Sequence, residues 1–237
     1  MIQILTRVRH PELYLKMQNS ARETASDLVT FSAAHDDGSP AIAESYNLLG
    51  VTSMADILLF VHDDIQFLSK GWDTKIREAL DLGFNVVGVC GSQKYEGGMI
   101  FDSGKQYSVG KVVSVVDGKR VVRLMEHRSE IEPCAAVDGM FMATTREHFL
   151  KTGFDLDFNG LFYYDLDFCL RSKCAVVDIL VAHEKPEHLR GVYPPGMKPM
   201  SDYADAFNKK HGFKSDPPIG NQRCDTMEYA DYVKEIA

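Results

Sequence analysis

The sequence predicts an α/β fold with a mostly parallel central sheet, helices on both faces and one small antiparallel hairpin. Three observations support this class. In residues 1–90, short apolar runs alternate with longer amphipathic segments, which is the pattern of a parallel sheet. The run Ile57–Val61 is continuously apolar, as expected for a strand buried on both faces. Farther along, Asp117-Gly118 separates two β-branched runs, which is a strong hairpin signal.

The elements of residues 1–90 can be placed in order from local signals. Proline marks the first helical position at Pro11, and again at Pro40 after the N-cap Ser39. Gly83 ends a third helix. The expected elements are a strand Ile2–Val8, a helix from Pro11, a strand Leu28–Ser32, a helix from Pro40 to Leu49, a strand Ile57–Val61, a helix Trp72–Leu82 and a strand Val86–Val89.

The remaining residues carry less regular signals. Apolar runs predict two further buried strands, helical spacing predicts two helices, and a segment rich in proline and glycine predicts a loop. The expected elements are a strand Val137–Thr144 with Asp138-Gly139 near its end, a helix Tyr163–Lys173, a strand Ala175–Ala182 ending at His183, a loop Glu184–Ser201 and a helix Asp202–His211.

The composition is that of an ordinary globular protein. The chain has 237 residues, of which 45% are hydrophobic, and no apolar run reaches the ~20 residues of a membrane helix. Residues 1–10 lack the pattern of a signal peptide, and five cysteines without a CxxC pair indicate reduced thiols. The net charge of −8 argues against nucleic acid as a partner. We therefore expect a cytoplasmic protein without stable membrane insertion.

His62, Asp63 and Asp64 follow directly on the buried run Ile57–Val61. Ligands bind at the carboxyl ends of strands in open parallel sheets. Two adjacent carboxylates at such a place are costly unless a cation compensates them. Carboxylate oxygens suit Mg²⁺ or Mn²⁺, which commonly bridge protein to substrate phosphates. The segment therefore predicts a metal–nucleotide site, although paired aspartates also form turns and helix caps.

A series of motifs occurs in a fixed order along roughly residues 1–185: FVHDDI, GW(x)₅AL, VDGMFMATTREHF, GFD and YYDLDFCLR. Together they resemble the family 2-like glycosyltransferases with the GT-A fold, most closely the streptomycin-biosynthesis type of glycosyltransferase-like domain. The resemblance implies a GT-A-like single domain with a Rossmann-like sheet over residues 1–212. Its nucleotide-binding half would be about residues 1–105 and its acceptor-side half about 106–212, followed by a tail, 213–237.

The activity that the resemblance implies is transfer of a sugar from a nucleoside diphosphate sugar, with a UDP-sugar favoured, to an acceptor hydroxyl. The family uses Mn²⁺ or Mg²⁺, and its D-x-D motif falls on His62-Asp63-Asp64, with histidine in place of the first aspartate. By this match Asp64 is the direct metal ligand, and Asp63 contacts the metal, a metal-bound water or the ribose. His183 matches a late metal-binding histidine, or is an ordinary loop histidine, and His62 contacts the donor or supports the ligands.

Two acids lie near the start of the helix YYDLDFCLR. In the resembling family an acid at this place deprotonates the acceptor hydroxyl, and the match falls on Tyr164-Asp165, without the family's glutamate. Asp167 can pair with Arg171 four residues later, whereas Asp165 has no such partner. Asp165 is therefore the expected catalytic base and Asp167 the alternative, although an acid near a helix start can simply interact with the dipole.

Further polar residues near expected strand ends complete the predicted site. Arg7 can pair with a diphosphate, and Asp36 can bind a ribose or base edge. The expected donor contacts are Thr6, Arg7, Ala33, His35, Asp36, Asn47, His62 and Asp63. The expected contacts to the sugar or acceptor are Trp72, Asp138, Gly139 and Tyr164. Basic residues of the loop form a candidate lid over the diphosphate: Lys185, Arg190 and Lys198.

Two other functions fit part of the same pattern. A nucleotidyltransferase also uses paired acids and a metal, but it usually carries an early glycine-rich basic signature, which TRVRHPELYL lacks. A non-catalytic nucleotide-sugar-binding module accounts for His62 in the motif and for the absence of glutamate before Asp165. The expected reaction is an inverting transfer, with a retaining mechanism as the alternative. The sequence names neither the sugar nor the acceptor.

Overall fold

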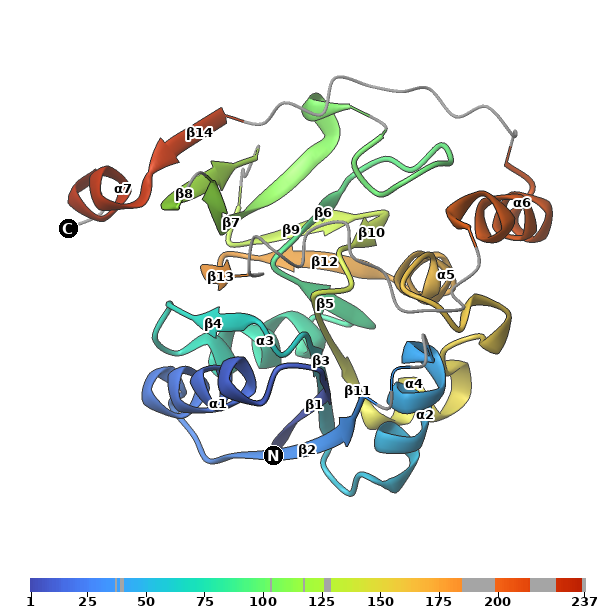
Figure 1. Ribbon diagram of the computed structural model, residues 1–237, viewed down its shortest axis with the longest axis horizontal. Helices are drawn as coiled ribbons and strands as arrows, with labels where there is room; N and C mark the ends of the chain where they lie inside the picture. Colours follow the sequence, from blue (N-terminus) through green and yellow to red (C-terminus); the bar gives the residue numbers. More distant parts are fainter. Residues whose placement is uncertain are drawn as a thin grey trace.

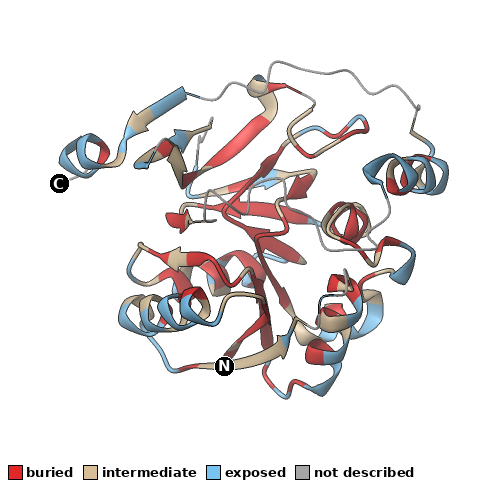
Figure 2. Cartoon of the chain, in the orientation of Figure 1, coloured by how far each residue is buried: buried red, intermediate tan, exposed pale blue. Residues whose placement is uncertain are grey.

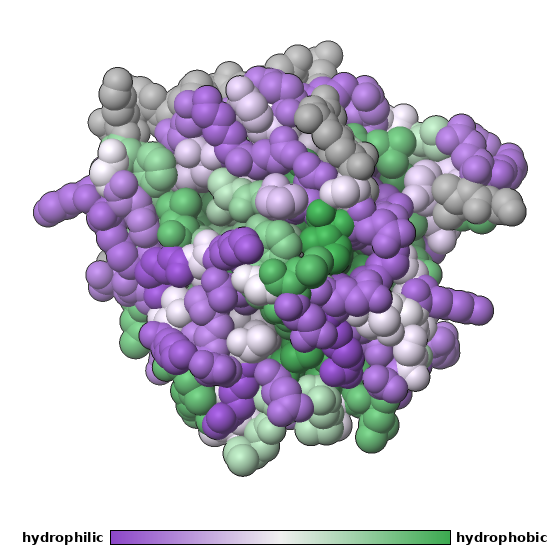
Figure 3. Space-filling view, turned by 180° about the vertical axis from the view of Figure 1, so that it is seen from behind, coloured by the Kyte–Doolittle hydropathy of each residue, from purple (hydrophilic) through white to green (hydrophobic). Residues whose placement is uncertain are grey.

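The computed structural model describes residues 1–36, 38, 41–102, 104–116, 118–125, 129–184, 199–213 and 225–235. Two sheets form the centre of the fold, with helices packed around them (Figure 1). The strands are mostly buried and the helices expose their outer faces (Figure 2). Figure 3 shows that the opposite side of the molecule is largely hydrophilic, with some apolar side chains gathered near its centre.

The first sheet has seven strands in the order β2-β1-β3-β11-β5-β12-β9. The pairs β1–β2, β1–β3 and β5–β12 are parallel, whereas β11 runs antiparallel to β3 and β5, and β9 runs antiparallel to β12. The predicted α/β class is confirmed, with a sheet that is mixed because β11 is inserted between parallel strands. The strand bounds are β1 Ile2–Val8, β2 Val29–His35, β3 Ile57–Val61, β5 Val86–Gly88, β9 Ile131–Cys134, β11 Phe141–Thr145 and β12 Cys174–Val177.

Strand β3 shows why the apolar run of the sequence is continuous. All five of its residues are buried. Ile57, Leu59 and Val61 pack into the core on one face of the sheet. Leu58 and Phe60 pack into the core on the other face. Because successive side chains of a strand point to opposite faces, a strand covered on both sides needs apolar residues at every position.

The helices cover these two cores. Met17 of α1 and Ile76 of α3 belong to the first core, whereas Tyr46 of α2 and Phe149 of α4 belong to the second. The predicted start at Pro11 is confirmed, and the predicted cap at Ser39 and Pro40 lies outside the described residues. The bounds are α1 Pro11–Thr24, α2 Ile42–Thr52, α3 Trp72–Asp81, α4 Arg146–Thr152, α5 Tyr164–Leu170, α6 Met200–His211 and α7 Tyr229–Glu235, with short 3₁₀ helices Lys105–Tyr107 and Leu156–Phe158.

The second sheet contains the predicted hairpin. Its strands lie in the order β10-β6-β7-β13-β4, and β8 pairs with β7 on one side and with β14 on the other. Val116 pairs with Lys119 across the turn, where Gly118 has φ +74°, a conformation that favours glycine. The bounds are β4 Ile65–Phe67, β6 Cys90–Ser92, β7 Ser108–Val116, β8 Lys119–Leu124, β10 Ala136–Val137, β13 Val181–His183 and β14 Asp225–Glu228.

The expected strand Val137–Thr144 is wrong, because the chain changes sheets within it. Ala136–Val137 pairs with β6 in the second sheet, and Phe141–Thr145 pairs with β3 and β5 in the first. The turn between them passes against α5 at Gly139, where a Cβ atom would lie 2.4 Å from Tyr164 Oη. This close approach requires glycine, and it brings the turn to the helix that carries the predicted base.

The expected strand Ala175–Ala182 is wrong for the same reason. Cys174–Val177 belongs to the first sheet, and Val181–His183 pairs with β4 and β7 in the second. An uninterrupted apolar sequence does not reveal such a change of partner, since both strands are buried. No helix in the described part of the chain is long and apolar enough to cross a membrane.

Candidate functional site

A cavity of about 340 Å³ opens beyond the carboxyl ends of β1, β2 and β3. Its polar lining includes Arg7, Asp36, Asp64 and His183. These residues are far apart in the sequence. They meet because parallel strands end at the same edge of the sheet, which is where open α/β folds bind ligands.

His62, Asp64 and His183 offer one ligand atom each, and the three atoms lie within 4.8 Å of one another. His62 and Asp64 follow β3 directly. His183 comes from β13, where it pairs with Ile65 in antiparallel register, and the next residue donates its N–H to the Asp64 carbonyl oxygen at 2.9 Å. The strand register therefore places His183 beside Asp64, with His183 Nε2 3.3 Å from Asp64 Oδ1.

The donor set of this cluster fits a divalent cation. Asp64 Oδ1 is buried and makes no hydrogen bond within the described residues. Burial opposes ionisation of this carboxyl, but the neighbouring His183 and His62 hold its pKa at about 2. A buried, ionised carboxylate beside two imidazoles offers an oxygen that a bound cation can share. Mixed oxygen and nitrogen ligands of this kind bind Mn²⁺ and other divalent metals.

A hydrogen bond to the hydroxyl of Tyr164 orients the ring of His62. Tyr164 Oη donates a hydrogen bond to the Gly139 carbonyl oxygen at 3.2 Å, so its oxygen accepts from His62 Nε2, 3.1 Å away. The proton on Nε2 leaves the lone pair on Nδ1, the form in which an imidazole can bind a metal. Burial lowers the pKa of His62, which favours this neutral form.

The structure does not bring Asp63 into the cluster. Asp63 Oδ2 accepts hydrogen bonds from the backbone N–H groups of Arg9 and His10, both at 2.6 Å. The side chain therefore fixes the loop between β1 and α1 against the cavity. The sequence predicts that Asp63 contacts the metal, a metal-bound water or the ribose, and that His62 is not a direct ligand. In the structure His62 lies in the cluster, whereas Asp63 lies outside it but lines the first cavity, so its contact with the donor stays a prediction. Hydrogen-bond partners of this kind are not visible in a run of three polar residues.

Two arginines of the first cavity are paired within the protein. Arg7 and Arg9 each contact Asp36 at 2.8 Å, one on each carboxylate oxygen. Burial opposes ionisation of Asp36, but the hydrogen bond from Arg9 and the charges of both arginines hold its pKa below the usual range. The carboxylate thus orients two guanidinium groups in the cavity lining.

Asp165 is the second residue of helix α5, directly after Tyr164, which contacts His62. Its Oδ2 accepts from the Gly139 N–H and its Oδ1 from the Leu166 N–H, both at 2.9 Å. Burial raises the pKa of Asp165 to about 7, and the nearby carboxylate of Asp138 adds to this. Tyr163, immediately before the helix, has φ +66°, which is unusual for a residue with a side chain. Strained backbone of this kind often accompanies functional sites.

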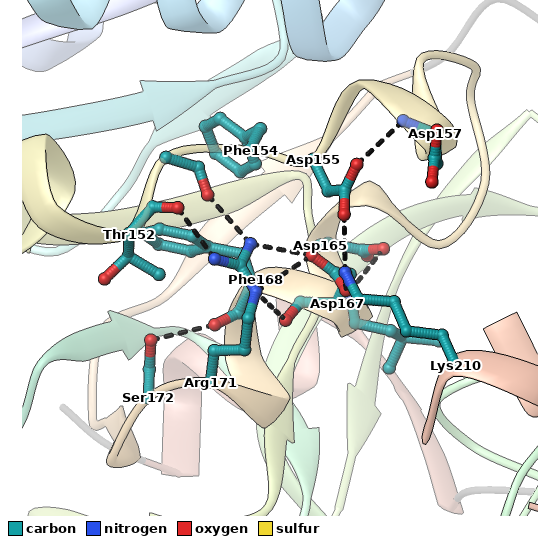
Figure 4. A network of polar contacts seen from close by, with 12 residues as sticks. Thr152, Phe154, Asp155, Asp157, Asp165, Asp167, Phe168, Arg171, Ser172 and Lys210 are labelled. Atoms are coloured by element: carbon teal, nitrogen blue, oxygen red, sulfur yellow. Dashed lines mark hydrogen bonds and ion pairs between the residues drawn. The ribbon is translucent and has the colours of Figure 1, made fainter. Parts of the chain in front are cut away.

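Asp167 has a different environment, shown in Figure 4. Its side chain is fully buried and contacts an arginine, a lysine and a histidine. Arg171 binds Oδ2 at 2.6 Å, whereas Lys210 at 2.5 Å and His211 at 2.9 Å bind Oδ1. The carboxylate therefore joins α5 to α6, and it lines neither cavity described here.

Several other expected contacts lie away from the first cavity. Trp72 is fully buried in the core, where its ring packs on Phe67 and its Nε1–H donates to the Ala21 carbonyl. Both amide atoms of Asn47 bond to the Phe154 backbone. Some residues that the sequence predicts as donor, sugar or acceptor contacts are not among the described residues that line the first cavity: Thr6, Ala33, His35, Asn47, Trp72, Asp138 and Gly139.

Other lining residues were missed by sequence reasoning. Arg9 and His10 directly follow the first strand, which is a signal that could have placed them at the strand ends. Tyr46 on α2 and Phe162 before α5 line the same cavity. Their sequence pattern is that of core aromatics, so nothing in it distinguishes them. The lid proposed for Lys185, Arg190 and Lys198 lies outside the described residues.

The fold and the site together define an α/β protein of the GT-A type with a candidate cation site at a strand end. The chain belongs to the Glycosyltransferase like family, whose model matches residues 5–210. The assignment to the streptomycin-biosynthesis subgroup stays a prediction. No curated protein matches the chain.

Two solved structures share the fold. One is GalNAc-T7 with UDP, GalNAc and Mn²⁺, at 8% identity and a TM-score of 0.60, covering 88% of this chain and 47% of that one. The other is residues 1–349 of *S. aureus* TarS with UDP-GlcNAc, at 12% identity and a TM-score of 0.53, covering 88% of this chain and 64% of that one. This chain thus spans less than two thirds of either protein, and the likeness establishes the fold.

Proposed function

We propose that this protein is a divalent-cation-dependent glycosyltransferase that moves a sugar from a UDP-sugar to an acceptor hydroxyl with inversion. The observation that carries the proposal is the convergence of His62, Asp64 and His183 at the end of β3, in a member of this family. The two similar structures, which hold UDP with Mn²⁺ and UDP-GlcNAc, support the choice of donor.

Asp64, His183 and His62 would hold the cation, which is Mn²⁺ or Mg²⁺. When bound, it would stabilise the negative charge that develops on the departing diphosphate. Tyr164 keeps the His62 lone pair available, and Asp63 holds the loop that carries Arg9. Side chains that are not themselves ligands thus prepare the site.

The rest of the first cavity would take the nucleoside diphosphate. Arg7 and Arg9 provide guanidinium groups for the diphosphate, and Asp36 holds both of them. Tyr46 and Phe162 supply apolar walls against which a nucleoside can pack. Most of these residues belong to the predicted nucleotide-binding half, about residues 1–105.

Asp165 is the proposed base. A carboxyl with a pKa of about 7 is partly ionised at neutral pH and matched to proton transfer from a hydroxyl. Each carboxylate oxygen accepts one backbone N–H, which leaves a lone pair for the acceptor. The acceptor oxygen would bond to the anomeric carbon as its proton passes to Asp165. The bond to the diphosphate breaks with its electron pair, so UDP leaves and the configuration inverts.

The metal-dependent part of UDP binding tests the proposal. Calorimetry should show that Mn²⁺ tightens UDP binding and that Asp64→Asn removes this gain, weakening binding about tenfold or more because a charged ligand is lost. The matched control is Asp56→Asn, since Asp56 is an exposed carboxylate that pairs with the N-terminus. Its UDP affinity should equal that of the wild type.

UDP binding that is indifferent both to Mn²⁺ and to Asp64→Asn would contradict the proposal. Release of pyrophosphate from a nucleoside triphosphate and a sugar phosphate would identify a nucleotidyltransferase instead. Binding of UDP-sugars without any release of UDP would identify a binding module. The anomeric configuration of the product separates inversion from retention.

A further inference from the structure

A second cavity, of about 170 Å³, lies next to the first and shares His183 with it. Asp138 and Met140, from the turn between β10 and β11, line it together with Arg123 and Met125. Gly139, between the two turn residues, donates its N–H to the proposed base Asp165. Two residues of the cavity wall, Asp138 and Met140, thus flank the glycine that is hydrogen-bonded to Asp165.

The hairpin β7–β8 determines which side chains face this cavity. Val112 pairs with Arg123 in antiparallel register, so their side chains project from the same face of the hairpin. Ser114, two residues farther along β7, and Met125, directly after the end of β8, line the cavity as well. The alternation of the strands therefore directs Arg123 to the cavity side.

Arg123 differs from the two arginines of the first cavity in its ion-pair partners. Arg7 and Arg9 are both paired with Asp36. Within the part of the chain that the structure describes, Arg123 has no ion-pair partner. The planar guanidinium group of such an arginine is suited to bidentate binding of a carboxylate or phosphate.

The C-terminal segment contacts two of the residues that line this cavity. Strand β14 pairs with β8 so that Thr226 lies opposite Arg123. Asp225 of the same strand contacts Lys105, the other cationic residue of the lining, at 2.7 Å. Lys105 is thus paired, whereas Arg123 has no ion-pair partner among the described residues, so its guanidinium group can bind an anionic ligand. Residues 225–228 lie beyond the family match at 5–210.

We propose that the second cavity is the acceptor subsite and that Arg123 selects an acceptor sugar carrying a carboxylate or phosphate group. The inference rests on the proposed function. The larger cavity holds the candidate metal cluster and takes the nucleoside diphosphate, so the adjoining one receives the second substrate. Its volume equals that of about six liquid waters at ~30 Å³ each, which suits one monosaccharide-sized group.

Methionine-methyl NMR tests this proposal at the cavity itself, since Met125 and Met140 both line it. Their signals are assigned by Met125→Leu and Met140→Leu. Glucose, glucuronate and glucose 6-phosphate are titrated into protein with saturating UDP and Mg²⁺, a diamagnetic cation. We expect glucuronate or glucose 6-phosphate to shift these methyl signals at concentrations about tenfold lower than glucose, because only they can pair with a guanidinium group.

Arg123→Gln should abolish the preference for the anionic sugars, while leaving UDP affinity unchanged. The matched control is Lys119→Gln, because Lys119 is a cation of the same hairpin that pairs with Glu228 and is not among the lining residues. This control should keep the preference. The comparison of glucuronate with glucose 6-phosphate shows whether the subsite takes a carboxylate or a phosphate.

Three results would overturn the inference: no shift of either methyl with any of the sugars, equal response to charged and neutral sugars, or a preference that survives Arg123→Gln. Displacement of glucuronate by UDP would also overturn it, because the cavity would then belong to the donor. The proposed function fails separately, through loss of metal-dependent UDP binding. If metal-dependent UDP binding is intact and no sugar shifts either methionine methyl signal, only the assignment of the acceptor subsite is contradicted.

Discussion

Helix α5 carries two aspartates, two residues apart, in opposite electrostatic environments. Burial, together with the nearby carboxylate of Asp138, raises the pKa of Asp165 to about 7, and its oxygens accept backbone N–H groups. Asp167 is fully buried and contacts Arg171, Lys210 and His211. The first can exchange a proton near neutral pH, whereas the second is a structural anchor. The comparison teaches that partners brought by the fold, rather than residue type or helix position, separate a proposed base from a structural acid.

Replacing Asp165 should have the largest effect. Asp165→Asn removes the proton acceptor, so the rate of Mn²⁺-dependent UDP release from UDP-sugars should fall about 10²–10⁴-fold. UDP affinity should stay unchanged, because the first cavity is not lined by Asp165. A coupled assay for UDP over a panel of UDP-sugars, with water or added sugars as acceptor, measures the rate. Near-normal release by the variant would show that the base has been assigned to the wrong residue.

Replacing Asp167 should give the opposite result, with stability lost and activity per folded molecule retained. Asp167→Asn removes the charge of a fully buried carboxylate that contacts Arg171 and Lys210, so the free energy of unfolding should fall by about 3 kcal/mol. Urea denaturation measures this change. Glu147→Gln is the control, because Glu147 forms an exposed pair with Lys151 four residues along a helix, and exposed pairs of this kind contribute little to stability. If Asp167→Asn is as stable as this control, the network in Figure 4 is not an anchor.

The pH dependence of the reaction tests the same contrast between Asp165 and Asp167, and its expected effect is smaller. Only ionised Asp165 can accept a proton, so log(kcat/KM) should rise with unit slope below pH 7, about tenfold per unit, and level off above it. Its raised pKa also means that the folded state binds this proton more tightly than the unfolded state. Asp165 therefore contributes stability most fully below about pH 4, and loses that contribution as pH rises towards 7.

The pH–rate profile is compared between the wild type and Asp165→Asn at saturating Mn²⁺. The residual activity of the variant should lack the step near pH 7. If the pH–rate profiles of both proteins show the step at the same pH, a group other than Asp165 titrates there. Asp167→Asn serves as the second comparison, and it should keep the wild-type profile.

Local sequence signals were sufficient for the first part of the fold. The apolar run of β3, the proline at the start of α1 and the Asp-Gly turn of the hairpin each depend on neighbours in the chain. These signals placed Asp64 at a strand end, next to the cavity. They failed where the chain changes sheets, at Asp138–Met140 and after Val177, because a buried strand looks the same in either sheet.

The candidate site was only partly predictable for the same reason. Asp64, His183, Arg7 and Asp36 come together as the sequence analysis expected, since all lie at strand ends. Whether His62 or Asp63 joins the cluster depends on partners far along the chain, namely Tyr164 and the loop after β1. A motif gives the order of side chains, but it does not give the direction in which each one points.

The sequence by itself determined the α/β class, the buried strand that ends in acidic residues and the hairpin, because periodicity and turn chemistry are properties of short segments. Only the tertiary structure decided that β11 runs antiparallel between parallel strands, that β14 extends the hairpin, and that Lys210 and His211 join Arg171 at Asp167. These features depend on strand register and on contacts between distant segments, whose energies arise only when the chain is folded.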